Sequence, residues 1–169
     1  MKKILLCFVI LLCGCALGFG QQSTSWDKFD WLIGKWLGEG GGNVGVGGGT
    51  FSFKYDLNKK VIVRKSHSEF AGNDKKPRLI HDDLMVIYLD TLGNASKAIY
   101  FDNENHVINY TITYSDKTII FTSEKFPATL LLRLTYTFVD PKTVETKFEM
   151  SQDGVKFITY IEGKSKKKK

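Results

Sequence analysis

The chain has 169 residues, only three of them cysteines, and a formal net charge of +6. Seven of its 24 basic residues lie in the first three and the last six positions, which leaves 17 basic against 18 acidic residues between them. The body of the chain therefore lacks the basic surface of a nucleic-acid-binding protein, and we expect no nucleic-acid partner.

Residues 1–20 have the order of a secretory signal peptide: two lysines, an apolar run, and then small residues. Two processing sites stay open. Leu12-Cys13-Gly14-Cys15 resembles a lipobox, which would make a lipidated Cys15 the first residue of the mature chain. Gly18-Phe19-Gly20 resembles an ordinary cleavage site. We expect an exported protein that is periplasmic, secreted or associated with the outer membrane.

All three cysteines lie within this leader, so the body has no disulfide and no cysteine nucleophile. Residues 21–163 are long enough for one domain with its own hydrophobic core. Residues 164–169, KSKKKK, are predicted to be a disordered tail, and two interpretations stay open: it adds to membrane attachment through Cys15, or it is a solvated terminus without a role.

The first predicted element is a short helical turn, because Trp26, Phe29 and Ile33 are apolar at helical spacing. From Thr50 onward the apolar period is two, as in Phe51–Leu57, which is typical of antiparallel strands with one buried face. Turn residues separate ten predicted strands, near 35–41, 49–57, 60–70, 81–90, 95–102, 106–114, 117–123, 129–139, 142–151 and 155–163.

The predicted fold class is all-β: a single antiparallel up-and-down barrel of about ten strands, preceded by the helical turn. Closing strand ten onto strand one removes the sheet edges. An even strand number places both chain ends at one rim. The opposite end, here called the distal rim, then carries the connections near 38–49, 71–80, 103–105, 124–128 and 152–154.

The segment Gly38–Gly49 contains many glycines, and Gly40–Gly45 matches the pattern G-x-G-x-x-G. No βαβ unit and no GK[ST] accompany the match, so it does not indicate a nucleotide site. We expect a flexible portal loop at the distal rim instead.

Alternation along the strands brings polar residues to the distal rim: His67, Glu69, His81, Asp83, Tyr100, Asp102 and His106. Three interpretations stay open. The cluster is a polar mouth above an apolar ligand site, a His-carboxylate metal site, or a solvated rim with ordinary ion pairs such as Lys65 with Asp83. We assign no metal ligand and no catalytic residue to it.

Two arginines, Arg64 and Arg133, lie on predicted strands. An inward arginine would bind a carboxylate or phosphate, but we expect both to point outward in cross-strand pairs. The expected ligand is a small hydrophobic or amphipathic molecule between aromatic walls that include Tyr110 and Tyr136, with Phe53, Phe138 and Phe148.

The opening Phe29–Trp36 with Gly38-Glu39-Gly40 resembles the L-x-G-x-W-x-G-x-G pattern that begins the first strand in the nitrobindin and fatty-acid-binding-like group of calycin-type barrels. The later segments VRKSHSEF, HDDLMVIY and AIYFDNENHVINY are similar to exported bacterial proteins of this shape. The resemblance implies about ten strands around an apolar cavity. Nitrobindins hold haem through a histidine late in the barrel. No histidine follows His106 here, so we carry over no haem ligand and assign no cofactor.

The sequence leaves three functions to compare: a ligand-binding barrel, an enzyme using His81 or His106 with Asp83 or Asp102 as acid and base, and a packed structural or interaction protein of the envelope. No hydrolase or protease signature is present, so binding is our first hypothesis. An interior void of a few hundred Å³ separates the first two functions from the third.

Overall fold

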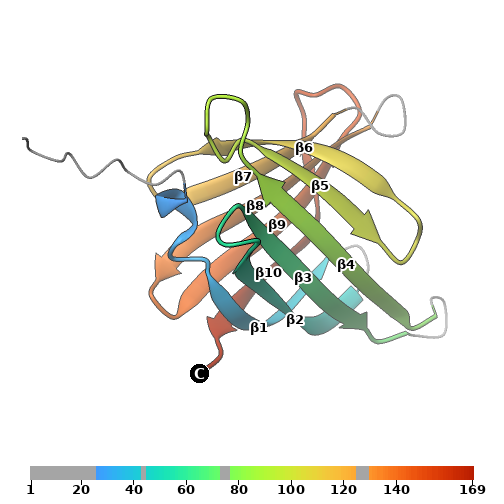
Figure 1. Cartoon of the computed structure of the whole chain (residues 1–169). Helices are drawn as coiled ribbons and strands as arrows, with labels where there is room; N and C mark the ends of the chain where they lie inside the picture. Colours follow the sequence, from blue (N-terminus) through green and yellow to red (C-terminus); the bar gives the residue numbers. More distant parts are fainter. Residues whose placement is uncertain (1–25, 43–44, 73–76, 125–129) are drawn as a thin grey trace, which may run out of the picture.

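The computed structural model describes residues 26–42, 45–72, 77–124 and 130–169. Cys15 and the rest of the predicted leader lie outside them. A 3-10 turn and ten strands follow one another (Figure 1): η1 Asp27–Phe29, β1 Gly34–Gly42, β2 Gly45–Asp56, β3 Val61–Phe70, β4 Leu79–Tyr88, β5 Lys97–Asp102, β6 Val107–Tyr114, β7 Thr118–Ser123, β8 Leu131–Asp140, β9 Thr143–Ser151 and β10 Ile158–Lys167.

Every strand pairs antiparallel with its neighbours in the chain, and β10 pairs with β1, so the sheet closes into a barrel. The closing ladder runs from Trp36 opposite Lys167 to Gly42 opposite Ile161. The predicted all-β barrel, its ten strands and its single helical turn are therefore confirmed. The connections β3–β4 and β5–β6 lie at the right end of the barrel in Figure 1, which is the distal rim.

The lysine-rich end departs from the prediction. β10 continues to Lys167, and its last residues pair with both β1 and β9, for example Lys166 with Leu37 and with Thr143. The predicted boundary at Gly163 was wrong for this reason: lysines can occupy the outward positions of a paired strand, where their charges stay in water.

The glycine-rich segment also departs from the prediction, because most of it belongs to β1 and β2 and is not a loop. Glycine is required where strands approach closely. A Cβ on Gly40 would lie 2.5 Å from the backbone oxygen of Glu162, and one on Gly163 would lie 2.5 Å from that of Glu39. Hydrogen-bond pairing and this close contact hold the hairpin in the wall of the barrel.

The 3-10 turn covers the end opposite the distal rim, at the left of Figure 1. Phe29 is fully buried, and its ring makes a T-shaped contact with Tyr114 and a tilted contact with Phe121. The Trp26 indole donates a hydrogen bond to the Lys59 carbonyl at 2.8 Å. These contacts confirm that the aromatic turn plugs this end.

Above the plug the interior is packed with side chains that have almost no solvent exposure: Trp36, Phe53, Ile62, Met85, Ile87, Ile119, Phe121, Tyr136 and Val144. They come from seven different strands, so burial of this layer requires the closed barrel. Among the described residues, no helix is long and apolar enough to cross a membrane.

Candidate functional site

A buried ion pair lies inside the barrel, above the packed layer. Arg64 on β3 donates to the carboxylate of Asp83 on β4, and the two side chains are only 8% and 6% exposed. Arg64 Nε also donates to the Tyr136 hydroxyl at 2.7 Å. Burial alone would lower the pKa of Arg64, but the Asp83 carboxylate together with the Tyr136 and Tyr100 hydroxyls more than offsets the effect of burial, and the pKa is raised. Arg64 is therefore a permanent buried cation.

Arg64 points inward because it continues the face of the buried Ile62, so the expectation of an outward Arg64 was wrong. The suggested ion pair of Lys65 with Asp83 was also wrong, since Lys65 is on the opposite face of β3 from Arg64. Arg133 does lie in an outward cross-strand pair, 2.8 Å from Glu149.

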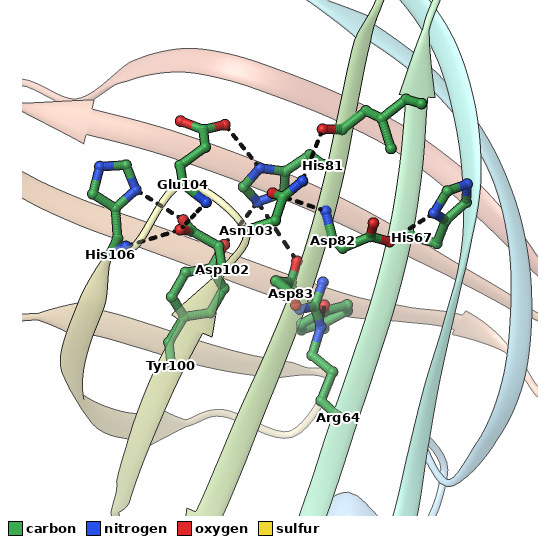
Figure 2. Close-up of polar contacts among 12 residues, drawn as sticks. Arg64, His67, His81, Asp82, Asp83, Tyr100, Asp102, Asn103, Glu104 and His106 are labelled. Atoms are coloured by element: carbon green, nitrogen blue, oxygen red, sulfur yellow. Dashed lines mark hydrogen bonds and ion pairs between the residues drawn. The ribbon is translucent and has the colours of Figure 1, made fainter.

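A chain of polar groups leads from Asp83 toward the distal rim (Figure 2). His81 Nε2 lies 3.8 Å from the Asp83 carboxylate and 2.8 Å from the Tyr100 hydroxyl. His81 Nδ1 lies 3.2 Å from Glu104. Burial, and then the nearby Asp83 charge, raise the pKa of Tyr100, so its phenol stays protonated.

A second pair, of one histidine and one carboxylate, lies on the β5–β6 side of the rim. His106 Nδ1 is 2.8 Å from Asp102, whose side chain is 3% exposed. Burial pushes the pKa of Asp102 upward, but hydrogen bonds from the backbone N–H groups of His106 and Glu104 and from the imidazole hold it below its ordinary value. Asp102 is thus a fixed acceptor that orients His106, not a proton donor.

His67 and Glu69 are separate from this interior set. They are on the outer face of β3, where their side chains are 47% and 44% exposed. His67 lies 2.7 Å from Asp82 and 3.1 Å from Glu69, and Figure 2 shows its contact with Asp82 on the outside of the sheet. Alternation places them opposite the inward Arg64, so they do not contribute to an interior mouth.

A cavity of about 120 Å³ lies between the ion pair and the distal rim, against the wall formed by β1, β2, β3, β9 and β10. Part of its wall is backbone, because the inward positions there are glycines: Gly38, Gly40, Gly47, Gly49 and Gly163. A side chain at these positions would take up the space. The name glycine-lined cavity is used for it below.

Aromatic and polar side chains complete the glycine-lined cavity. Phe51, Phe70 and Phe148 supply apolar surface. Arg64 lies at its inner end, with Ser66 and Ser68 above it on the same strand and Ser165 and Thr146 on β10 and β9. The Thr146 hydroxyl oxygen is buried, and it has no hydrogen-bond partner among the described residues. The cavity thus combines apolar walls with a few polar groups, as ligand sites do.

A second hollow of about 380 Å³ opens at the rim beside it, lined by Leu130, Met150, Ser151, Gln152, Asp153, Lys156, Ile158 and Tyr160. The ring of Phe148 in the glycine-lined cavity and that of Tyr160 in this rim hollow make a T-shaped contact, with 6.2 Å between ring centres. The linings of the two spaces therefore touch each other near the distal rim.

The predicted site is only partly assembled. His81, Asp83 and Tyr100 form one polar chain with Arg64, and Asp102 and His106 form a separate pair. Tyr110 and Tyr136 are buried in the core and do not line the glycine-lined cavity. Of the aromatic residues expected to line a ligand site, Phe148 does so. No group of three or more potential metal ligands comes together in the described part of the chain.

The lining residues that sequence reasoning missed include the glycines, the hydroxyl residues Ser66, Ser68, Thr146 and Ser165, and the aromatic residues Phe51 and Phe70. A glycine run in strands has the same sequence as a glycine-rich loop, and small hydroxyl residues occur on both faces of a sheet. The alternation from Ile62 through Arg64 to Ser66 and Ser68 was the one available signal.

Two solved structures have a similar fold. The crystal structure of Rv2717c from M. tuberculosis is 11% identical, with a TM-score of 0.59 over 86% of this chain and 98% of that chain. The S-type phycobiliprotein lyase CPES from Guillardia theta is 11% identical, with a TM-score of 0.51 over 88% of this chain and 94% of that chain. No protein-family model and no curated protein matches this sequence. The likenesses show a calycin-like barrel fold.

Proposed function

We propose that this protein is an exported carrier or sensor that binds a small amphipathic molecule inside its barrel. The observation that carries the proposal is the glycine-lined cavity, about 120 Å³ of interior space with aromatic walls and the buried Arg64 at its inner end. A barrel whose only role is structural gains stability by filling such space, because voids forfeit packing energy.

At about 120 Å³ the cavity is smaller than the void of a few hundred Å³ expected for a ligand-binding barrel, and smaller than the cavity of about 150 Å³ that holds benzene, so it suits a very small molecule or the end group of a longer one. Longer molecules would extend into the adjoining rim hollow beside Tyr160. Phe51 and Phe148 would contact the apolar part of the ligand, and hydroxyl groups such as Ser66 would contact its polar end. This mixed lining supports an amphipathic ligand rather than a purely hydrophobic one.

The arrangement favours binding over catalysis. An acid–base mechanism needs a proton-transferring group within hydrogen-bond reach of the ligand. Asp102 is the last residue of β5 and His106 directly precedes β6, and neither residue is among the described lining residues of the cavity. His81 is likewise not among those lining residues.

A fragment titration tests the proposed function. Uncharged fragments of six to ten non-hydrogen atoms are added to the isotope-labelled protein, and amide shifts are followed by NMR. We expect shifts to concentrate on β3 and β9 around Ser68 and Phe148. Ser68→Phe, which fills the cavity from β3, should abolish them. Lys65→Phe, an outward change on the same strand, should preserve them.

Shifts confined to the outer face, or shifts that survive Ser68→Phe, would contradict an interior site. Export is tested separately, by the intact mass of the protein from its native envelope. A chain beginning at an acylated Cys15 and one beginning after Gly20 differ in mass by several residues and the lipid. A chain that retains residues 1–20 would contradict export.

A further inference from the structure

The charge on Arg64 is already balanced inside the barrel, and this restricts what can bind beside it. Asp83 neutralises the guanidinium, and both side chains are almost fully buried. Asp83 itself is not among the lining residues of the glycine-lined cavity, whereas Arg64 is. The guanidinium of Arg64 therefore borders the cavity, and the Asp83 carboxylate that neutralises it does not.

The described residues bring no other charge into the cavity. Glu39 and Glu162 also border the cavity, but each lies on the outward face of its strand. The neighbours of Glu39 on both sides are inward-facing glycines, and Glu162 precedes the inward-facing Gly163. Arg64 is thus the one charged group on the inward face of this lining. Asp83 balances this charge, so the Arg64–Asp83 pair as a whole carries no net charge.

Arg64 contributes only hydrogen-bond donors to the cavity, whereas the hydroxyl groups of its lining both donate and accept. A guanidinium has five N–H groups, and among the described residues Arg64 uses its Nε–H for Tyr136 and one terminal nitrogen for Asp83. Ser66 and Ser68 add hydroxyl groups. The buried Thr146 hydroxyl, without a partner in the described part of the chain, is a polar atom for which a ligand would supply the missing bond.

We infer that the glycine-lined cavity selects uncharged molecules that carry a hydrogen-bond acceptor, such as an amide, ketone or ester carbonyl, and discriminates against carboxylates. This inference rests on the proposed function and names its ligand class. A carbonyl oxygen accepts a charge-assisted bond from Arg64 at little desolvation cost. A carboxylate would be a third buried charge, attracted by Arg64 but repelled by Asp83, and stripped of its water.

Two probes of nearly equal shape test the inference. Isobutyramide and isobutyrate each have six non-hydrogen atoms, and only the second is an anion at neutral pH. NMR titration of the wild-type protein should give a dissociation constant for isobutyramide at least about tenfold lower than that for isobutyrate, because the anion loses its hydration. Equal affinities, or tighter binding of isobutyrate, would overturn the inference and leave the proposed function intact. Binding of neither probe at the cavity would overturn both.

Asp83→Asn should reduce or remove the preference for the uncharged probe. The substitution keeps the shape of the side chain but removes the counter-charge, so Arg64 becomes an uncompensated cation. The ratio of the two dissociation constants should then move toward isobutyrate by at least about tenfold. An unchanged ratio in a folded Asp83→Asn protein would overturn the role of the ion pair.

Thr146→Val is the companion variant, since it removes only the unpartnered hydroxyl. We expect it to weaken isobutyramide binding by roughly threefold to tenfold, as for loss of one hydrogen bond. Unchanged binding would overturn the assignment of Thr146 to the site. If Asp83→Asn does not fold, the comparison of the two probes on the wild-type protein still decides the ligand class.

Discussion

Removing the Asp83 carboxylate is the sharpest test of how the charge of the buried Arg64 is neutralised. Asp83→Ala leaves Arg64 buried, and among the described residues the Tyr136 hydroxyl, 2.7 Å from Nε, remains as its hydrogen-bond partner. The guanidinium side chain is 8% exposed, so bulk water replaces the lost carboxylate poorly. The protein must then either keep an unpaired charge in its core or open the barrel to hydrate it.

The expected loss of stability is large for a single substitution. Breaking a buried ion pair by removing one partner costs about 3–5 kcal/mol. A domain of this size loses roughly 2–4 °C of melting temperature per kcal/mol, so the midpoint should fall by roughly 6–20 °C. Replacing both residues, as Arg64→Met with Asp83→Leu, should recover most of the loss because no charge is left behind.

Urea unfolding followed by tryptophan fluorescence measures the change, since Trp36 is fully buried in the same barrel. The matched control is Glu145→Ala. Its partner Lys164 lies 3.0 Å away on the outer face, and the two side chains are 68% and 45% exposed for lysine and glutamate. That variant should lose no more than about 1 kcal/mol. Equal losses in Asp83→Ala and Glu145→Ala would refute the reasoning.

Three further predictions concern the wall, the plug and the outer face. Gly163→Ala should cost about 1–3 kcal/mol in urea unfolding through overpacking, since a Cβ there would lie 2.5 Å from the backbone of β1; Gly93→Ala, with nothing within 4 Å, should lose about 1 kcal/mol for its positive φ, and a larger loss at Gly93 would contradict the close approach. Phe29→Ala should cost about 3–5 kcal/mol by emptying the plug, and a calorimetric loss below about 1 kcal/mol would show that the turn is dispensable. Hydrogen bonds to Asp82 and then Glu69 raise the pKa of His67 above its ordinary 6.5. An NMR titration should therefore give a His67 pKa above 6.5, and Asp82→Asn should lower that pKa. Because the folded pKa is the higher one, the stability that His67 contributes is present below pH 6.5 and is lost as the pH rises through the folded pKa. A His67 pKa at or below 6.5 in the wild-type protein would contradict this contribution of His67 to stability.

The architecture was predictable because each strand carries its own period-two pattern and each turn its own residues. The end of β10 was not. Lys164, Lys166 and Lys167 have the composition of a solvated tail, and they are strand residues only because β1 and β9 offer unsatisfied backbone on both sides. Composition reports the side chains, whereas pairing is decided by the neighbouring strands.

The candidate site was predictable in its residue types but not in its faces. On β3 the run Val61, Ile62 and Val63 is apolar on both sides, so alternation alone does not say whether Arg64 or His67 faces the interior. The outer valines lie beside apolar neighbours on β4, for example Val63 opposite Val86, which hides the usual contrast between a wet and a dry face.

Local sequence was enough for the strands, the turns, the plug and the closed barrel, because those follow from alternation, turn chemistry and the need to leave no open edge. The inward direction of Arg64, its pairing with Asp83 nineteen residues later, and the hollow beside glycines that looked like a loop all depend on how distant strands meet. Register across a closed sheet is a collective property of all ten strands, and a slip of one residue would exchange the two faces.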